Sequence, residues 1–318
     1  MTSRSQEYKI GMAAFTNRIA FVVPTKDRPH DLRRMLASVE AQSFRPEQVI
    51  VVDGSEDRGE KIVGEFPALN IEYLRAYPPS LSKQRNVGMA AVDPSITIAG
   101  YLDDDLVLEP GAMEAMLVFW EKAPNDVGGA RFNIVNEEFP QVVWLKSLFF
   151  LEGRKRGSLL PSGYQTSFGP VLKDTYVSWL SGGVTLWRRV VVREFAYDEW
   201  FQGTGYLEDV DYSYTVGKRY KLVVVADARV KHLSYPVRKE SNYVLGRWQA
   251  INRMYFVKKH REFWLPLCYW SMFGEFLLNL GTAVTQIDGW RLRRAWGNLA
   301  GLGRVVQGRI EKTDGLLK

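Results

Sequence analysis

Three consecutive aspartates, Asp103, Asp104 and Asp105, follow the apolar run 96–102. The run predicts a buried strand, so the three acids fall at its carboxyl end, where α/β sheets bind their ligands. Carboxylate oxygens are ligands that Mg²⁺ and Mn²⁺ prefer, and these ions keep positions free for substrate phosphates. The triplet therefore indicates a metal–diphosphate site. Taken alone, it leaves a solvated acidic turn open as the alternative.

A second acidic pair, Glu208 and Asp209, opens a helix that the pattern predicts over 206–220. Carboxylates in a first helical turn commonly stabilise the helix, and that interpretation stays open. A carboxylate facing an electrophile is also the general base that an attacking hydroxyl needs. His232, one of three histidines, ends a predicted strand and is either structural or a further metal ligand.

Other polar clusters follow predicted strands. Asp53 ends the second strand and could accept hydrogen bonds from a base or ribose, although an Asx turn is the better explanation for this residue taken alone. The segment 24–28 adds polar residues after the first strand. Segment 82–86 begins a helix, so its amides and Arg85 could face a diphosphate, while Arg85 could equally be a surface residue.

The elements that must position these residues alternate between strand and helix in the first half of the chain, which predicts a parallel sheet covered by helices. We expect strands over 19–24, 49–52, 71–74, 96–102 and 127–133, and helices over 32–39, 82–92 and 109–122. Segment 137–175 is irregular, which is typical of a functional loop or lid. Short strands follow over 222–226 and 228–232, and beyond Ser241 the chain is expected to form three helices.

Composition limits the class of protein. With 318 residues, 46% of them hydrophobic, the chain can bury a large core, so we expect one large domain with an appended segment. The single cysteine, Cys268, excludes an internal disulfide framework and a cysteine-based zinc site. Residues 1–18 are polar and lack the apolar stretch of a signal peptide, so we expect an intracellular protein.

The basic excess behind the net charge of +6 lies in the C-terminal part, next to segment 264–287, whose only charged residue is Glu275. Cations beside an aromatic, apolar segment favour a membrane surface over nucleic acid. Glu275 and the break at Pro266 argue against a spanning helix, so we expect peripheral membrane contact through 264–310. Packing on the catalytic domain, or across a homodimer, is the alternative.

Six motifs, in this order and spacing, resemble inverting family 2 glycosyltransferases of the GT-A fold, of the kind that build bacterial polysaccharides. The resemblance spans about residues 19–235. The motifs are Phe21-Val22-Val23-Pro24-Thr25, Val51-Val52-Asp53-Gly54-Ser55, Ser82-Lys83-Gln84-Arg85-Asn86-Val87-Gly88, Asp103-Asp104-Asp105, Ser181-Gly182-Gly183 and Gly205 with Glu208-Asp209-Val210-Asp211.

The resemblance implies roles for individual residues. Asp209 corresponds to the general base, and Glu208 helps to bind the acceptor. Asp105 and Asp103 hold Mn²⁺ or Mg²⁺, with His232 as a further ligand. The nucleotide-binding residues implied are Pro24, Thr25, Asp27, Asp53, Arg85, Asp103 and Asp104, and the acceptor residues are Trp179, Gly182, Gly183 and Glu208. The family commonly has two aspartates before Gly-Ser in the second motif, where this chain has Val52-Asp53.

The implied activity moves a sugar from a UDP-, GDP- or dTDP-linked donor to a hydroxyl of a glycan or lipid-linked glycan at the inner face of the cytoplasmic membrane. The expected domains are a polar segment 1–18, a GT-A domain 19–238 with a nucleotide-binding half 19–133 and an acceptor-binding half 134–238, and a helical region 239–318. An inactive sugar-nucleotide-binding regulator and a nucleotidyltransferase remain as alternatives. Segment 24–31 contains no glycine, whereas a nucleotidyltransferase would need a glycine-rich loop there.

Overall fold

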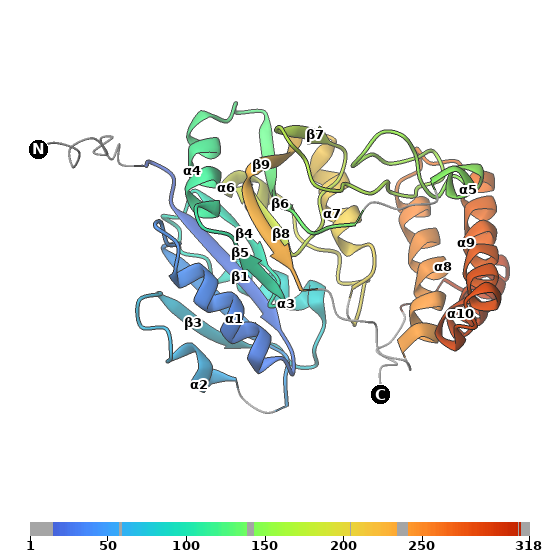
Figure 1. Ribbon diagram of the computed structural model, residues 1–318, viewed down its shortest axis with the longest axis horizontal. Coiled ribbons are helices and arrows are strands. Elements are labelled where there is room, and N and C mark those ends of the chain that lie inside the picture. Colours follow the sequence, from blue (N-terminus) through green and yellow to red (C-terminus); the bar gives the residue numbers. More distant parts are fainter. Residues whose placement is uncertain are drawn as a thin grey trace, which may run out of the picture.

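A mixed β-sheet forms the centre of the part of the chain from β1 to β9 (Figure 1). The computed structural model describes residues 15–56, 59–138, 143–203, 205–233, 241–310 and 312. The strands are β1 (Ile19–Thr25), β2 (Gln48–Asp53), β3 (Ile71–Arg75), β4 (Ile98–Leu102), β5 (Leu106–Leu108), β6 (Val127–Ile134), β7 (Thr175–Val177), β8 (Val184–Arg188) and β9 (Lys221–His232). The helices are α1 (Pro29–Glu40), α2 (Glu60–Val63), α3 (Leu81–Ala90), α4 (Ala112–Lys122), α5 (Val143–Leu148), α6 (Arg189–Glu194), α7 (Glu208–Gly217), α8 (Ser241–Lys259), α9 (Leu265–Thr285) and α10 (Gly289–Val306).

The strand order is β3-β2-β1-β4-β8-β6-β9-β5, and β7 pairs with β9. The first four strands are parallel, as the alternation of strand and helix predicts. Next to them, β8 inserts antiparallel between β4 and β6. Because β4 and β8 run in opposite directions, the residues that follow β4 lie beside those that precede β8. This arrangement brings Asp103 next to the Ser181-Gly182-Gly183 segment.

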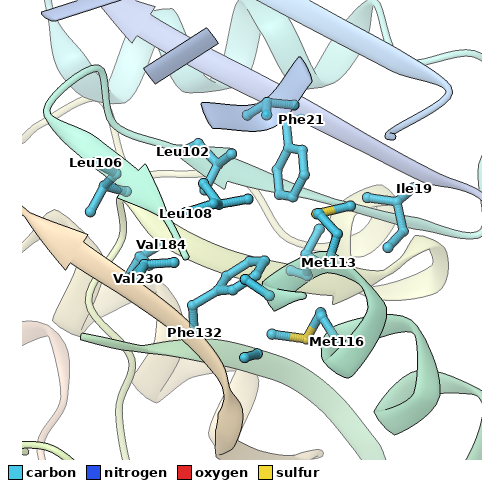
Figure 2. Packing of buried hydrophobic residues seen from close by; sticks show 14 of the residues in the cluster. Ile19, Phe21, Leu102, Leu106, Leu108, Met113, Met116, Phe132, Val184 and Val230 are labelled. Carbon is cyan, nitrogen blue, oxygen red and sulfur yellow. The ribbon is translucent and has the colours of Figure 1, made fainter. Parts of the chain in front are cut away.

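The strands are apolar because both faces of the sheet are covered. All seven residues of β1 are buried, as are all five of β4 and all eight of β6. On one face, Phe21 of β1 and Phe132 of β6 pack with Met113 and Met116 of α4 (Figure 2). This rigid core fixes the strand ends on which the polar clusters lie.

The last three helices, α8, α9 and α10, form a bundle beside the sheet domain, with α8 lying between the other two and α7 (Figure 1). Asp288 caps α10 by accepting hydrogen bonds from the backbone nitrogens of Trp290 and Arg291. Within the described part of the chain, no helix combines the length and the apolar character needed to cross a bilayer. The predicted trio of helices after Ser241 is confirmed.

Two sequence predictions need correction. The two short strands expected over 222–226 and 228–232 are one strand, β9, because a register shift against β6 accommodates Asp227 without ending the strand. The helix expected over 206–220 begins only at Glu208, since Leu207 adopts a left-handed backbone with φ of 76°. The predicted boundary between 238 and 239 lies outside the described residues, as does part of the predicted loop 137–175, and the domain division stays a prediction.

Candidate active site

The aspartate triplet lies directly after β4, as the apolar run predicts. Strand β5 begins directly after Asp105. It pairs antiparallel with the end of β9, which sets Leu106 opposite His232. This pairing brings the imidazole to the triplet, with Nε2 of His232 lying 3.2 Å from Oδ1 of Asp105. The sequence suggested His232 as a partner of the triplet, and the structure places the two together.

Each aspartate of the triplet faces a different neighbour. Asp104 points inward, where the hydroxyl of Thr25 donates to its Oδ2 over 2.7 Å. Burial raises the pKa of Asp104 to about 7, although Thr25 and Arg28 oppose the shift. Burial alone would also raise the pKa of Asp105, but the contacts with His232 and Arg28 outweigh it and the pKa is lowered. Asp105 is therefore the member of this pair that is held ionised.

Arg28 was not among the predicted site residues, yet its Nη1 lies 3.2 Å from Oδ1 of Asp104 and 3.0 Å from Oδ2 of Asp105. Its side chain is 46% exposed, and it extends from the end of the loop after β1. Only its position in the polar segment 24–28 could have signalled this role. Arg28 places a positive charge at the mouth of the site, where a diphosphate would be attracted.

Arg85 joins the two acidic clusters. Its Nη1 donates to Oε1 of Glu208 over 2.9 Å, and its Nη2 donates to Oδ1 of Asp103 over 3.2 Å. The side chain is only 1% exposed, and the rings of Tyr101 and Tyr197 lie 5.7 and 5.0 Å from its guanidinium carbon. Glu208 and the aspartate triplet thus meet on opposite sides of one buried cation, Arg85.

Because Gly182 and Gly183 have no side chains, Arg85 and Asp103 can lie close to their backbone. A Cβ atom on Gly182 would lie 2.5 Å from Nη1 of Arg85, and one on Gly183 would overlap the carboxylate of Asp103. The backbone nitrogen of Asp103 also donates to the carbonyl of Gly183 over 2.8 Å. Any side chain here would separate the two acidic clusters.

Asp209 accepts hydrogen bonds from two backbone nitrogens, Gly182 to Oδ2 over 3.1 Å and Val210 to Oδ1 over 2.8 Å. Burial raises the pKa of Asp209, and the charge of Arg85 and these two hydrogen bonds offset part of the shift. Burial together with the neighbouring charge of Asp209 also raises the pKa of Glu208. A carboxylate with a raised pKa and a fixed orientation has the properties of a general base that works near neutral pH.

The predicted nucleotide-binding residues surround the ends of β1 and β2. Asp53 is 1% exposed, and its oxygens accept hydrogen bonds from Ser55, Gly59 and the hydroxyl of Tyr73. Burial would raise the pKa of Asp53, but these hydrogen bonds outweigh it and the pKa is lowered. This is the Asx-turn geometry that the sequence left open, so Asp53 shapes the loop, and its contact with a nucleotide stays a prediction.

The remaining residues of the first motif differ in exposure. Pro24 and Thr25 are buried at the end of β1, whereas Asp27 is exposed, with φ of 54°, and its backbone nitrogen donates to Ser55 Oγ over 2.8 Å. This hydrogen bond joins the loop after β1 to the loop after β2. Among these residues, the Asp27 carboxylate offers the most surface to a ligand.

The helix α3 motif contacts the acceptor half more than the strand ends. Gln84 alone turns toward β1 and β2, donating to the carbonyls of Thr25 and Val52. Ser82 donates to the carbonyl of Phe201, and Asn86 exchanges hydrogen bonds with the backbone of Tyr197. With Arg85 directed at Glu208, the direct contact of Arg85 with a diphosphate stays a prediction.

Trp179 is largely buried. It is 7% exposed, its ring packs on Phe168 at a centroid distance of 4.3 Å, and its Nε1 donates to the carbonyl of Thr166. Little of its surface remains for an acceptor, and its predicted acceptor contact is not tested. Arg131, which the sequence did not signal, lies close by, where its Nε donates to Ser181 Oγ over 2.8 Å.

The residues at the triplet have the chemistry of a site for Mn²⁺ or Mg²⁺. A carboxylate oxygen of Asp105 and an imidazole nitrogen face each other across 3.2 Å, and carboxylate and imidazole groups together suit Mn²⁺. In the described ranges, however, no three Asp, Glu, His or Cys side chains converge as a ready metal site. The carboxylate of Asp103 contacts the guanidinium of Arg85, and the carboxylate of Asp105 contacts the guanidinium of Arg28.

Comparison with known families finds a similarity in the first half of the chain. Residues 20–171 match the family described as glycosyl transferase family 2. Over this range the chain is similar to that family. The matched range includes the aspartate triplet and Arg85, and ends before the segment that carries Glu208 and Asp209. A search of curated protein sequences finds no match to this chain.

Solved structures show that this chain has the GT-A fold. A mannosyltransferase, PcManGT from Pyrobaculum calidifontis, in complex with GDP-Man and Mn²⁺, is 13% identical, with a TM-score of 0.56 over 95% of this chain and 89% of that one. TarS 1–349 of S. aureus is 15% identical, with a TM-score of 0.52 over 92% and 82%. GalNAc-T7 with UDP, GalNAc and Mn²⁺ is 16% identical, with a TM-score of 0.54 over 85% and 58%.

Proposed function

We propose that this protein is a family 2 glycosyltransferase, a metal-dependent, inverting enzyme that moves a sugar from a nucleoside diphosphate to a hydroxyl group of a glycan or lipid-linked glycan. The observation that carries the proposal is the meeting of the aspartate triplet and the Glu-Asp pair at Arg85, whose two nitrogens contact Asp103 and Glu208. We assign the triplet to the donor side and the Glu-Asp pair to the acceptor side. The Mn²⁺ in the PcManGT and GalNAc-T7 structures supports the choice of metal.

Asp105, Asp103 and His232 would hold the cation. A bound Mn²⁺ or Mg²⁺ supplies positive charge that stabilises the leaving diphosphate. Arg28 adds a further cation at the same side, because its guanidinium already contacts Asp104 and Asp105. On the nucleotide side, the loops that contain Asp27 and Asp53 lie at the ends of β1 and β2.

Asp209 takes the proton of the acceptor hydroxyl as its oxygen forms a bond to the anomeric carbon. The bond between that carbon and the diphosphate oxygen breaks, and the diphosphate leaves with the bonding electrons. The backbone nitrogens of Gly182 and Val210 fix the orientation of the base. Attack from the face opposite the leaving group inverts the anomeric configuration, as any single displacement requires.

The test is release of nucleoside diphosphate from a panel of UDP-, GDP- and dTDP-sugars, with Mn²⁺, with Mg²⁺ and with EDTA. We expect release from at least one donor, which EDTA abolishes. Mass spectrometry of the products then separates sugar transfer from nucleotidyl transfer, because only the former frees the diphosphate. A protein that binds donors without cleaving any of them would be a regulator and would refute the proposal.

The base assignment has its own test. Asp209→Asn keeps the size of the side chain and removes the base, so turnover should fall on the order of 10²–10⁴-fold while the nucleotide affinity changes little. Asp126→Asn, at an exposed position just before β6, is the control. Normal sugar transfer by Asp209→Asn would exclude Asp209 as the base. The anomeric configuration of the product, read by NMR, tests inversion separately.

We also place the acceptor at an anionic membrane surface, as in the assembly of bacterial surface polysaccharide. Exposed apolar residues recur at helical spacing on the outer sides of α9 and α10. They are Trp270, Phe273, Val284, Leu292, Trp296, Leu299 and Val306. Arg291, Arg293 and Arg304 of α10 are exposed beside them and supply the cations that anionic head groups attract. A homodimer through this surface is the competing outcome.

A further inference from the structure

The segment that leads to the proposed base runs between two helices. Residues 197–207 lie between α6 and α7 and directly precede Glu208. We name this segment the base loop; Thr204 within it is not described. Helix α3 holds one side of it, where the backbone nitrogen of Leu81 donates to the carbonyl of Gly203 over 3.0 Å and Ser82 donates to Phe201. Since α3 belongs to the nucleotide half, this side ties the base loop to the donor site.

The other side of the base loop rests on α8. Asn252 is 1% exposed, and its Nδ2 donates to the carbonyl of Tyr206 over 3.0 Å. The ring of Tyr255 stacks on Trp200 at a centroid distance of 3.7 Å and an interplanar angle of 4°. Trp248 lies against Gly203, where a Cβ atom would come within 2.9 Å of the indole.

The last turn of α8 contacts both the start of the base loop and the first turn of α7. Nζ of Lys259 lies 2.7 Å from Oδ2 of Asp198 near the start of the base loop and 2.7 Å from Oδ2 of Asp211 in the first turn of α7. The hydroxyl of Tyr255 also donates to Asp198, over 2.8 Å. His260, directly after the helix, lies 2.8 Å from Oδ1 of Asp211. Asp211 is two residues beyond the proposed base and is 2% exposed.

These α8 residues lie on one face of the helix, because Trp248, Asn252, Tyr255 and Lys259 are spaced by four, three and four residues. The base loop needs such support. Gly203, Gly205 and Leu207 all have positive φ, of 66°, 64° and 76°. For leucine this is a strained backbone, which persists only where the surroundings determine it. The carbonyl that Asn252 binds precedes Leu207 directly.

We propose that this face of α8 is a positioning element of the active site, with Lys259 as its central positioning residue. Lys259 fixes the distance between the start of the base loop and the first turn of α7, and thereby sets Asp209 relative to Gly182 and the donor side. The inference rests on the proposed role of Asp209. It assigns the C-terminal helices a part in catalysis that is independent of any membrane contact.

The experiment compares Lys259→Met with Lys258→Met, whose side chain is exposed one position away on the same helix. The probe is the UDP-, GDP- or dTDP-sugar that the unaltered protein cleaves fastest with Mn²⁺. We expect Lys259→Met to lose turnover on the order of 10- to 100-fold, as for a catalytic group displaced by about 1 Å, while the affinity for the corresponding nucleoside diphosphate stays within about twofold. Lys259→Arg, which keeps the charge, should recover most of the turnover.

Two further measurements keep the result decisive. Tyr255→Phe keeps the stack on Trp200 and removes only the hydroxyl that reaches Asp198, so it should give a smaller loss of the same kind without unfolding. Hydrogen exchange of peptides within 198–211 should rise in Lys259→Met and stay unchanged in Lys258→Met, whatever the donor. Turnover and exchange in Lys259→Met equal to those of Lys258→Met would overturn the inference. Normal transfer by Asp209→Asn would instead overturn the proposed function.

Discussion

Arg85 and Glu208 are 123 residues apart in the chain, and they form a buried ion pair in which Nη1 donates to Oε1 over 2.9 Å. The same guanidinium reaches Asp103. One side chain therefore contacts both a proposed donor-side group and a proposed acceptor-side group. Because the pair is buried, losing one partner would leave an unpaired charge in a region of low dielectric.

Above the raised pKa of Glu208, Arg85→Met should destabilise the protein by about 3–5 kcal/mol, because it leaves an ionised carboxylate buried without its partner. Urea unfolding followed by circular dichroism measures the change. The double variant Arg85→Met, Glu208→Gln should recover part of the loss, since it removes the uncompensated charge as well. Arg33→Met breaks an exposed pair with Glu65 and serves as the control, with little effect expected. Equal stability of Arg85→Met and Arg33→Met would show that the buried pair is not structural.

Gly183→Ala should remove most donor cleavage, on the order of 10²-fold, because the new methyl group would displace the carboxylate of Asp103. Gly281→Ala is the matched substitution: nothing lies within 4 Å of its Cβ position in α9, so it should keep activity and raise stability by about 0.5–1 kcal/mol. Release of nucleoside diphosphate and thermal unfolding are measured on both. Full activity in Gly183→Ala would mean that Asp103 has room to move.

The stability should depend on pH through Glu208. Its pKa is raised in the folded protein above the ordinary value of 4.5, so above that pH the folded state binds more protons than the unfolded state. The free energy of unfolding therefore falls as the pH rises from about 4.5 through the raised pKa. Glu208→Gln should flatten this decline between pH 5 and 8, and Glu65→Gln, on the surface, should not. Urea midpoints across this range check it, and parallel curves for the two variants would contradict the raised pKa.

Membrane contact predicts that vesicles containing phosphatidylglycerol capture the protein in flotation, while phosphatidylcholine vesicles capture much less. Trp270→Ser together with Phe273→Ser should weaken capture on the order of tenfold or more, because each aromatic loses its burial in the interface. Leu172→Ser with Tyr176→Ser removes exposed apolar side chains elsewhere and should change nothing. If sedimentation shows a dimer that only the α9 variant dissociates, the surface belongs to a second copy of the chain.

Local patterns predicted the parallel half of the sheet because each strand is an apolar run between clear breaks, and the triplet after β4 followed from one such run. The insertion of β8 between β4 and β6 has no local signal, since it depends on pairing between distant segments. The meeting of Asp103 with Gly183 could therefore be expected only through the family resemblance.

Arg85 shows the same limit at a single residue. Its position in a helix after Pro78-Pro79 suggested a diphosphate ligand or a surface residue, whereas the structure buries it between carboxylates and two tyrosine rings. For α8 the sequence contains a weak signal. The spacing of Trp248, Asn252, Tyr255 and Lys259 marks one helix face, but these residues are not purely apolar, so the pattern does not by itself predict a packed surface.

The base loop also has a consequence for engineering. Its backbone accepts hydrogen bonds from α3 on one side and from α8 on the other. A hybrid built from two relatives would therefore have to preserve both sets of contacts. An exchange of C-terminal helices between relatives should carry residues 197–211 with them as a single cassette. A protein shortened before Ser241 would keep every proposed catalytic side chain and still lose the register of Asp209.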